Sequence, residues 1–222
     1  MNVDYSYKKS VSVEDAKLIL ADYKKTLSEE HNKFVRIQLT KEYNIVTKTI
    51  TIGRRTFTGT YRESEDRKNN KEAYIKETKI SIVLASKGFD IILLKETDSK
   101  TMLNDEKRKK HLDNSKSDAL VNGIVMDFKE ITGTSKNTLG NNYQDAMRKK
   151  NSQGAVLFLL RNMKEKEVFD QLASKTKSSG NGLVLIYHED KDSLQIINMK
   201  NLRAAHRAAR IGIAPDQKVE PH

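Results

Sequence analysis

Two aspartates and a lysine in the middle of the chain have the types and spacing of a hydrolytic site. Asp118 stands just before one apolar run, and Asp127 and Lys129 stand near the end of the next. Asn122-Gly123 joins the two runs and favours a two-residue β-hairpin turn. Because a hairpin brings its outer ends together and residues two apart on a strand share a face, we expect the three side chains to converge. Two carboxylates that bind a divalent cation, with a lysine that orients or deprotonates water, are what metal-assisted phosphodiester hydrolysis requires.

The segments on either side of the hairpin have the patterns of an α/β protein. Upstream, apolar residues recur at helical spacing over 72–87 and predict a helix that ends at Gly88. Residues 91–94 are apolar and predict a strand. Downstream, the predicted elements are a loop at 130–140, a helix at 141–151, a strand at 154–160, a helix at 163–177, strands at 183–187 and 194–199, and a helix at 201–210. His188 is interpreted as a turn residue rather than a catalytic one. This order predicts an α/β sandwich with a mixed sheet.

Residues 1–62 precede this core, and their sequence pattern predicts an accessory α+β segment. A helix is expected at 11–31, and residues 32–62 are rich in β-forming side chains that predict a small sheet docked on the core. Residues 63–71 are polar throughout and are interpreted as a linker or an exposed helix start. The arginines of this region are interpreted as solvated surface residues, with phosphate contacts as the alternative; they are Arg54, Arg55 and Arg62.

The composition favours a nucleic-acid partner and excludes several classes of site. The 222 residues carry a formal net charge of +11, with 14 basic and 10 acidic residues in 1–70, 16 and 12 in 71–160, and 11 and 8 in 161–222. An evenly basic protein attracts polyanions. The chain has no cysteine, which excludes disulfides, Cys-ligated zinc and thiol catalysis. No apolar run approaches the roughly 20 residues of a membrane span, and no signal peptide is recognised, so we expect action in a cytosol.

The order of acid, strand, acid, any residue and lysine resembles the PD-(D/E)xK motif of restriction-endonuclease-like nucleases. The chain more closely resembles the toxin C-terminal domains of contact-dependent growth inhibition (CdiA-type) systems, several of which cleave tRNA. That resemblance covers roughly residues 72–200. Its features, in chain order, are Glu77 eight residues before the alanine of Leu84-Ala85, the turn Gly88-Phe89, the Asn-Gly hairpin, the polar Ser135-Lys136-Asn137 and the Asn-rich Asn141-Asn142. The departures are Ser117 for the usual proline, Asp127 for the commoner glutamate, and a basic insertion at 98–116.

The resemblance implies roles for particular residues. Glu77 would complete a metal site with Asp118 and Asp127, the cofactor would be Mg²⁺ or Mn²⁺, and Lys129 would activate the attacking water. Substrate contacts are expected from polar residues that follow the hairpin, namely Ser135, Lys136, Asn137, Asn141, Arg148 and Lys149. Arg148 and Lys149 are equally interpretable as charges that complement a helix C-terminus. The basic run at 107–111 is either a substrate clamp or a charged loop.

The resemblance also implies a domain plan and a function. The plan is a restriction-endonuclease-like α/β/α core at 71–200, the accessory α+β segment at 1–70, and a basic C-terminal helix and tail at 201–222. The function expected is a metal-dependent endonuclease of the toxin type that acts on tRNA, with a small acidic immunity protein as partner. The alternatives are a DNA nuclease of a phage or mobile element, or a factor that binds nucleic acid or protein without cutting.

Overall fold

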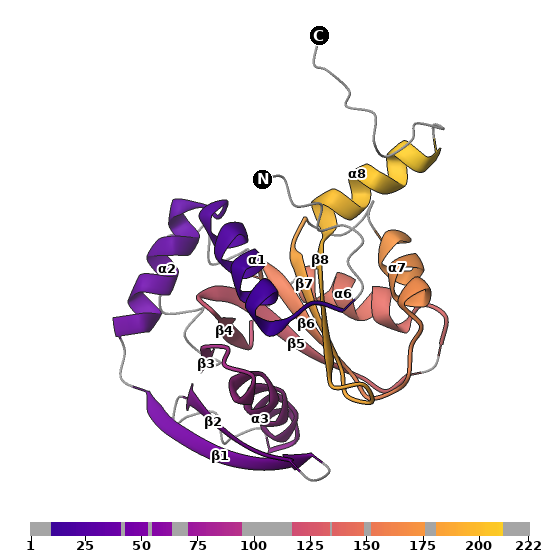
Figure 1. Ribbon diagram of the computed structural model, residues 1–222. Coiled ribbons are helices and arrows are strands. Elements are labelled where there is room, and N and C mark those ends of the chain that lie inside the picture. Colours follow the sequence, from indigo (N-terminus) through magenta and orange to yellow (C-terminus); the bar gives the residue numbers. More distant parts are fainter. Residues whose placement is uncertain are drawn as a thin grey trace.

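The computed structural model describes residues 10–40, 43–52, 55–63, 71–94, 117–133, 135–148, 152–175 and 181–210 of the chain. Across these ranges the protein is an α/β fold in which six helices pack on the two faces of one eight-stranded mixed sheet (Figure 1). The strands lie in the sheet in the order in which they occur in the sequence. In this part of the chain, no helix is both long enough and apolar enough to cross a membrane.

The strand direction reverses four times across the sheet. Their bounds are β1 Asn44–Ile52, β2 Arg55–Glu63, β3 Ile91–Leu93, β4 Ala119–Val121, β5 Ile124–Ile131, β6 Gly154–Leu159, β7 Leu183–His188 and β8 Ser193–Asn198. The pairs β2–β3, β5–β6 and β6–β7 are parallel, and the other neighbouring pairs are antiparallel. The parallel strands β6 and β7 are buried along their whole length, as their continuous apolar sequences predict.

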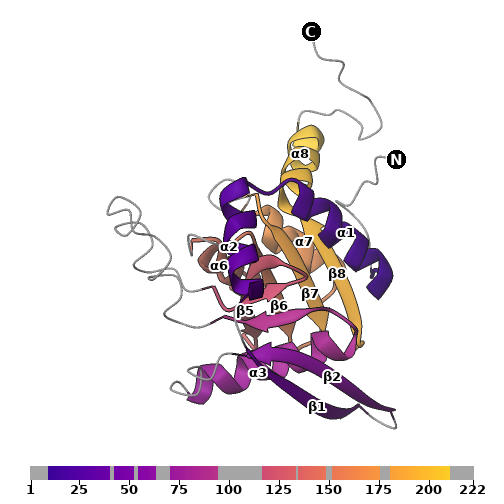
Figure 2. The same cartoon turned by 90° about the vertical axis from the view of Figure 1, so that its left-hand side faces the viewer.

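Helices cover both faces of the sheet. Their bounds are α1 Val13–Lys25, α2 Glu29–Thr40, α3 Lys71–Ser86, α6 Thr138–Arg148, α7 Glu165–Ala173 and α8 Met199–Arg210. On one face, α1 and α3 pack against a cluster that includes Met126 and Phe128 of β5. On the other, α6, α7 and the start of α8 pack against Leu157 of β6, while α2 packs against Leu120 and Val125 of the hairpin. Figure 2 shows β1 and β2 beside α3 at one end of the molecule and α8 at the other.

The predicted hairpin turn is confirmed. Asn122 has a φ of 49° and Gly123 a φ of 78°, the pair of positive values that a two-residue type I′ turn needs. Gly88, two residues after the last residue of α3, has a φ of 87°, as expected for a glycine that ends a helix. At the far edge of the sheet, the Val11 N–H donates to the Leu194 carbonyl over 2.8 Å, so the first described residues lie along β8.

The N-terminal region differs from its prediction in two respects. The helix expected over 11–31 stops at Lys25, and α2 then begins at Glu29, so the residues of 34–40 that were assigned to a β-rich stretch are helical. The cause is packing, because Val35 on α2 is buried against the β3–β5 strands. The hairpin of β1 and β2 is also no separate docked sheet, since β2 pairs in parallel with β3 and extends the main sheet.

His188 also differs from its prediction. It is the last residue of β7, 2 % exposed, and its Nε2 lies 2.8 Å from the side-chain oxygen of Gln195 on β8. The polar residues that follow, Glu189-Asp190, suggested a turn, but the turn begins one residue later.

Candidate active site

The β4–β5 hairpin brings Asp118 and Asp127 to the same place. Ala119 pairs with Met126, so the same antiparallel register puts Asp118 opposite Asp127. The Phe128 N–H donates to Oδ2 of Asp118 over 2.7 Å, and the Leu94 N–H donates to the Asp118 carbonyl over 2.9 Å. These two bonds fix Asp118 between β3 and β5. Asp118 is 9 % exposed, and its carboxylate is oriented by a backbone donor, as a ligand or an electrostatic group should be.

Asp127 and Lys129 project from the same face of β5, as their spacing predicts. The Lys129 Nζ lies 2.6 Å from Oδ2 of Asp127. The Asp127 side chain is completely buried, whereas that of Lys129 is 22 % exposed. The ion pair therefore joins a fully buried carboxylate to a side chain that is partly exposed to solvent.

The different lengths of β4 and β5 place the site where β4 begins and β5 continues. β4 begins at Ala119, whereas β5 continues to Ile131 and keeps its parallel pairing with β6 to the end. Among the described residues, the second half of β5 is thus paired along its β6 side only. Lys129 lies on this stretch.

Glu77 lies on α3, which begins at this end of the sheet. Its backbone carbonyl accepts a hydrogen bond from the Ser81 hydroxyl over 2.8 Å. One residue earlier, the pKa of Lys76 is raised chiefly by its bond to Glu72 and to a smaller degree by the charge of Glu130 on β5, so the first turns of α3 lie near the end of β5. Among the described residues, no three His, Cys, Asp or Glu side chains gather closely enough to hold a metal ion. The role of Glu77 in a metal site therefore stays a prediction.

The donor chemistry at the hairpin fits a hard divalent cation. Mg²⁺ is commonly held by one or two protein carboxylates, with water and substrate phosphate completing the shell. Asp118 and Asp127 supply carboxylate oxygens from facing strands, and the backbone bond to Asp118 fixes one of them. Asp118 and Asp127 are therefore the residues that would hold such an ion, and Glu77 is a further candidate ligand.

The predicted substrate-binding residues that the structure describes lie at the start and at the end of α6. Ser135, Lys136 and Asn137 are exposed in the turn before α6, and Asn141 is exposed in its first turn. The helix begins at Thr138 rather than at Asn141.

Much of the hydrogen bonding at the start of α6 is satisfied within the protein. The Ser135 hydroxyl lies 2.6 Å from that of Thr138, and the Leu139 N–H donates to the Gln171 side chain over 2.9 Å. Arg148 ends the helix, about 15 Å along its axis from the first turn, so its backbone is not at the mouth of the site. Lys149 and the basic run at 107–111 lie outside the described residues.

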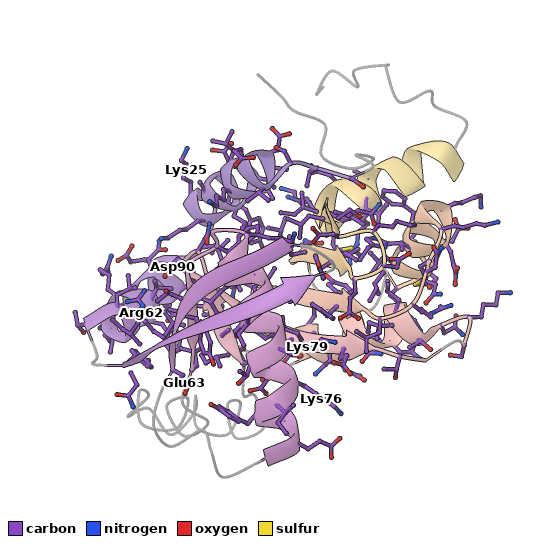
Figure 3. All side chains as sticks on the ribbon, turned by 60° about the horizontal axis from the view of Figure 1, so that its bottom comes forward. Lys25, Arg62, Glu63, Lys76, Lys79 and Asp90 are labelled. Atoms are coloured by element: carbon purple, nitrogen blue, oxygen red, sulfur yellow. The ribbon has the colours of Figure 1, made fainter. Side chains whose placement is uncertain are left out.

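Two polar clusters at the β2–β3 end of the sheet were not found by sequence reasoning. Arg62, which was interpreted as a solvated residue, forms an ion pair with Asp90 at 3.1 Å, and Figure 3 shows the two side chains together. Glu63, the next residue, is 6 % exposed and bonded to Tyr61 and Tyr74. The one local signal is the spacing of Tyr61 and Glu63, which puts both on one strand face.

Part of the chain is similar in sequence to a toxin family. Residues 115–203 match the sequence model described as contact-dependent growth inhibition CdiA C-terminal domain, which is less than half of the 222 residues. The matched segment includes the hairpin and both aspartates. Among solved structures, the chain is similar to a CdiA-CT/CdiI toxin and immunity complex from Burkholderia pseudomallei, with 15 % identity, a TM-score of 0.43, and coverage of 69 % of this chain and 97 % of that one. No curated protein matches the chain.

Proposed function

We propose that the chain is a metal-dependent endonuclease of the toxin type that hydrolyses phosphodiester bonds, with tRNA as the favoured substrate. The observation that carries the proposal is the geometry of the hairpin, with the Asp118 carboxylate fixed by the Phe128 N–H at 2.7 Å and Lys129 Nζ 2.6 Å from Asp127. The family match over residues 115–203 supports the toxin class, because it spans these three side chains.

Each side chain has a separate task in this proposal. Asp118 and Asp127 would hold Mg²⁺ or Mn²⁺, and Glu77 would complete the set directly or through water. When bound, such a cation stabilises negative charge on the phosphate and lowers the pKa of a coordinated water. Lys129 would orient the attacking water and offset the charge that develops on the phosphate oxygens. Ser135 and Asn141, both exposed beside α6, would contact the substrate backbone.

A second candidate is a protein that binds nucleic acid without cutting it. The observation that favours this function is the complete burial of Asp127, whose carboxylate already has a cationic neighbour in Lys129. A site of this kind would keep the charge of Lys129 for phosphate binding. A DNA nuclease is the third candidate, and the fold does not distinguish it from an RNA nuclease.

A cleavage assay distinguishes the candidates. Purified protein is incubated with total tRNA, single-stranded DNA and duplex DNA, each with Mg²⁺, Mn²⁺ or EDTA. We expect metal-dependent loss of tRNA that is absent in Asp118→Ala and retained in Asp22→Ala, which removes an exposed carboxylate from α1. Full activity of Asp118→Ala would show that the assignment of the site is wrong. Salt-sensitive binding with no cleavage of any substrate would favour the second candidate.

A protein inhibitor is part of the proposal. The solved complex pairs a toxin with an immunity protein. For this chain we propose a small acidic inhibitor, because a net charge of +11 favours a partner of opposite sign. The same proposal divides the chain into three parts, at 1–70, 71–200 and 201–222. It also includes a cytosolic site of action.

A further inference from the structure

A buried carboxylate lies at the end of β2, close to the candidate active site. Glu63 is 6 % exposed, and Tyr61, two residues earlier on the same face, is 1 % exposed. The Tyr74 hydroxyl donates to both carboxylate oxygens of Glu63 at 3.1 Å, and the Tyr61 hydroxyl donates to Oε2 at 3.3 Å. No lysine or arginine among the described residues pairs with this carboxylate. Figure 3 labels Glu63 on β2 and Lys76 on the neighbouring α3.

The two phenols stay protonated and able to donate at neutral pH. Burial raises the pKa of Tyr61 and of Tyr74 above the usual 10, and the nearby charge of Glu63 raises both further. Burial of a carboxylate against neutral groups alone is expensive compared with an apolar side chain of similar size. The hydroxyl groups of Tyr61 and Tyr74 therefore offset part of the cost of burying Glu63.

Glu63, Tyr61 and Tyr74, here called the Glu63 cluster, join two elements of the fold. Tyr61 comes from β2 and Tyr74 from the first turns of α3, so the carboxylate ties the start of the helix to the end of the strand. In the sheet, Glu63 pairs with Leu93, which pairs with Ala119, the neighbour of Asp118. Along the helix, Glu77 follows Tyr74 by three residues and lies on the same side.

We propose that Glu63 is a positioning residue, which acts through Tyr74 to hold the first turns of α3, and with them Glu77, against the sheet end that carries Asp118. The last link of this inference, the effect on catalysis, rests on the proposed nuclease function. The first link, the hold on the helix, does not. A loose first turn would change the position of Glu77 at this end of the sheet, and in an active site a displacement of about 1 Å can lower a rate by roughly 100-fold.

Conservative variants test the proposal. Tyr74→Phe removes one hydroxyl group, and Glu63→Gln keeps an acceptor but removes the charge. The matched control is Tyr187→Phe, which removes another buried phenol–carboxylate bond, to Asp192 at 2.7 Å, from β7 and the turn that follows it. We expect Tyr74→Phe to lower kcat about 10- to 100-fold with KM for the substrate unchanged, while Tyr187→Phe cleaves normally.

Amide hydrogen exchange gives a readout that does not depend on activity. In Tyr74→Phe the amides of residues 75–78, the first in α3 with acceptors inside the helix, should exchange roughly fivefold faster or more, while those of β6 and β7 keep their protection. Unchanged exchange together with unchanged kcat would overturn the proposal. If the unaltered protein cleaves nothing, the nuclease function fails, and the exchange data alone decide whether Glu63 holds the helix. If Tyr74→Phe does not fold, Glu63→Gln carries the same two measurements.

Discussion

At the scale of single residues, the candidate site is a set of charges that depend on one another. Asp127 is fully buried and lies 2.6 Å from Lys129, whose side chain keeps 22 % of its surface exposed. Removal of one partner of a buried pair leaves the other without compensation, which is more costly than removal of both. The ion pair therefore constrains both residues, whatever reaction they serve.

Lys129→Met should lower the free energy of unfolding by about 3 kcal/mol, near the lower end of the range for broken buried pairs because Lys129 is partly exposed. The double variant Asp127→Asn/Lys129→Met should recover most of that loss. Urea unfolding monitored by circular dichroism measures both. A double variant that is less stable than Lys129→Met would show that the pair is not coupled in this way.

Asp118 has a structural task that is separable from its charge. Asp118→Ala leaves the Phe128 N–H without its acceptor and should cost about 1–3 kcal/mol of stability. Asp118→Asn keeps an oxygen acceptor and should cost much less, yet should be as inactive in cleavage. Thermal unfolding beside the tRNA assay tests this, and equal melting temperatures for the two variants would contradict it.

At the scale of elements, α2 docks on the tip of the hairpin through His31. The imidazole Nε2 lies 3.3 Å from the Gly123 carbonyl. Burial lowers the pKa of His31 below its usual 6.5, and the neighbouring Lys24 lowers it further, while the bond to Gly123 partly offsets both. The folded protein thus binds a proton at His31 less readily than the unfolded chain does.

Because the folded-state pKa of His31 is the lower one, its contribution to stability is full above about pH 6.5 and is lost as the pH falls below that value. We expect the free energy of unfolding to fall more steeply between pH 7 and pH 5 in the unaltered protein than in His31→Gln. Urea titrations at a series of pH values give the two slopes. Identical slopes would mean that His31 does not contribute.

The hairpin turn depends on Gly123 for its backbone conformation. At a φ of 78°, an alanine at this position is strained, and its Cβ would lie 2.6 Å from the Lys24 ammonium. Gly123→Ala should cost roughly 1–2 kcal/mol, and Gly123→Asn less, since asparagine adopts positive φ more readily. Thermal melts of both variants measure the difference, and an alanine variant as stable as the asparagine variant would contradict this account.

Local patterns predicted the elements of the core, and contacts between distant segments decided the rest. The Asn-Gly turn, the Gly88 stop and the buried runs of β6 and β7 each have a local cause, so the sequence was enough to place them. The break between α1 and α2 depends on the packing of Val35 against β3–β5, which no window of residues reveals. The closeness of Asp127 and Lys129 followed from strand spacing. The contact of Glu63 with Tyr74 could not be predicted in this way, because Tyr74 belongs to α3 and Glu63 to β2.

At the scale of the whole molecule, the net charge of +11 should govern encounter with nucleic acid. Neutralised phosphates release counterions, so the binding constant falls steeply with salt. For the inactive Asp118→Asn protein on tRNA, we expect the logarithm of the binding constant to fall linearly with the logarithm of salt concentration, with a loss of about tenfold or more between 50 and 200 mM. Fluorescence anisotropy measures it, and salt-independent binding would exclude a phosphate-dominated interface.

The order of the strands has a consequence for how the chain can assemble. Each strand from β2 to β8 pairs with the strand that precedes it in the sequence, so each can add to a partner that has already formed. A chain that emerges from a narrow opening with its N-terminus first can therefore build the sheet progressively, without a gap that waits for a later strand. The bond between Val11 and Leu194 is different, because it needs both the first described residues and the last strand. It can form only after β8 has been made, and it joins the first described residues to the last strand of the sheet.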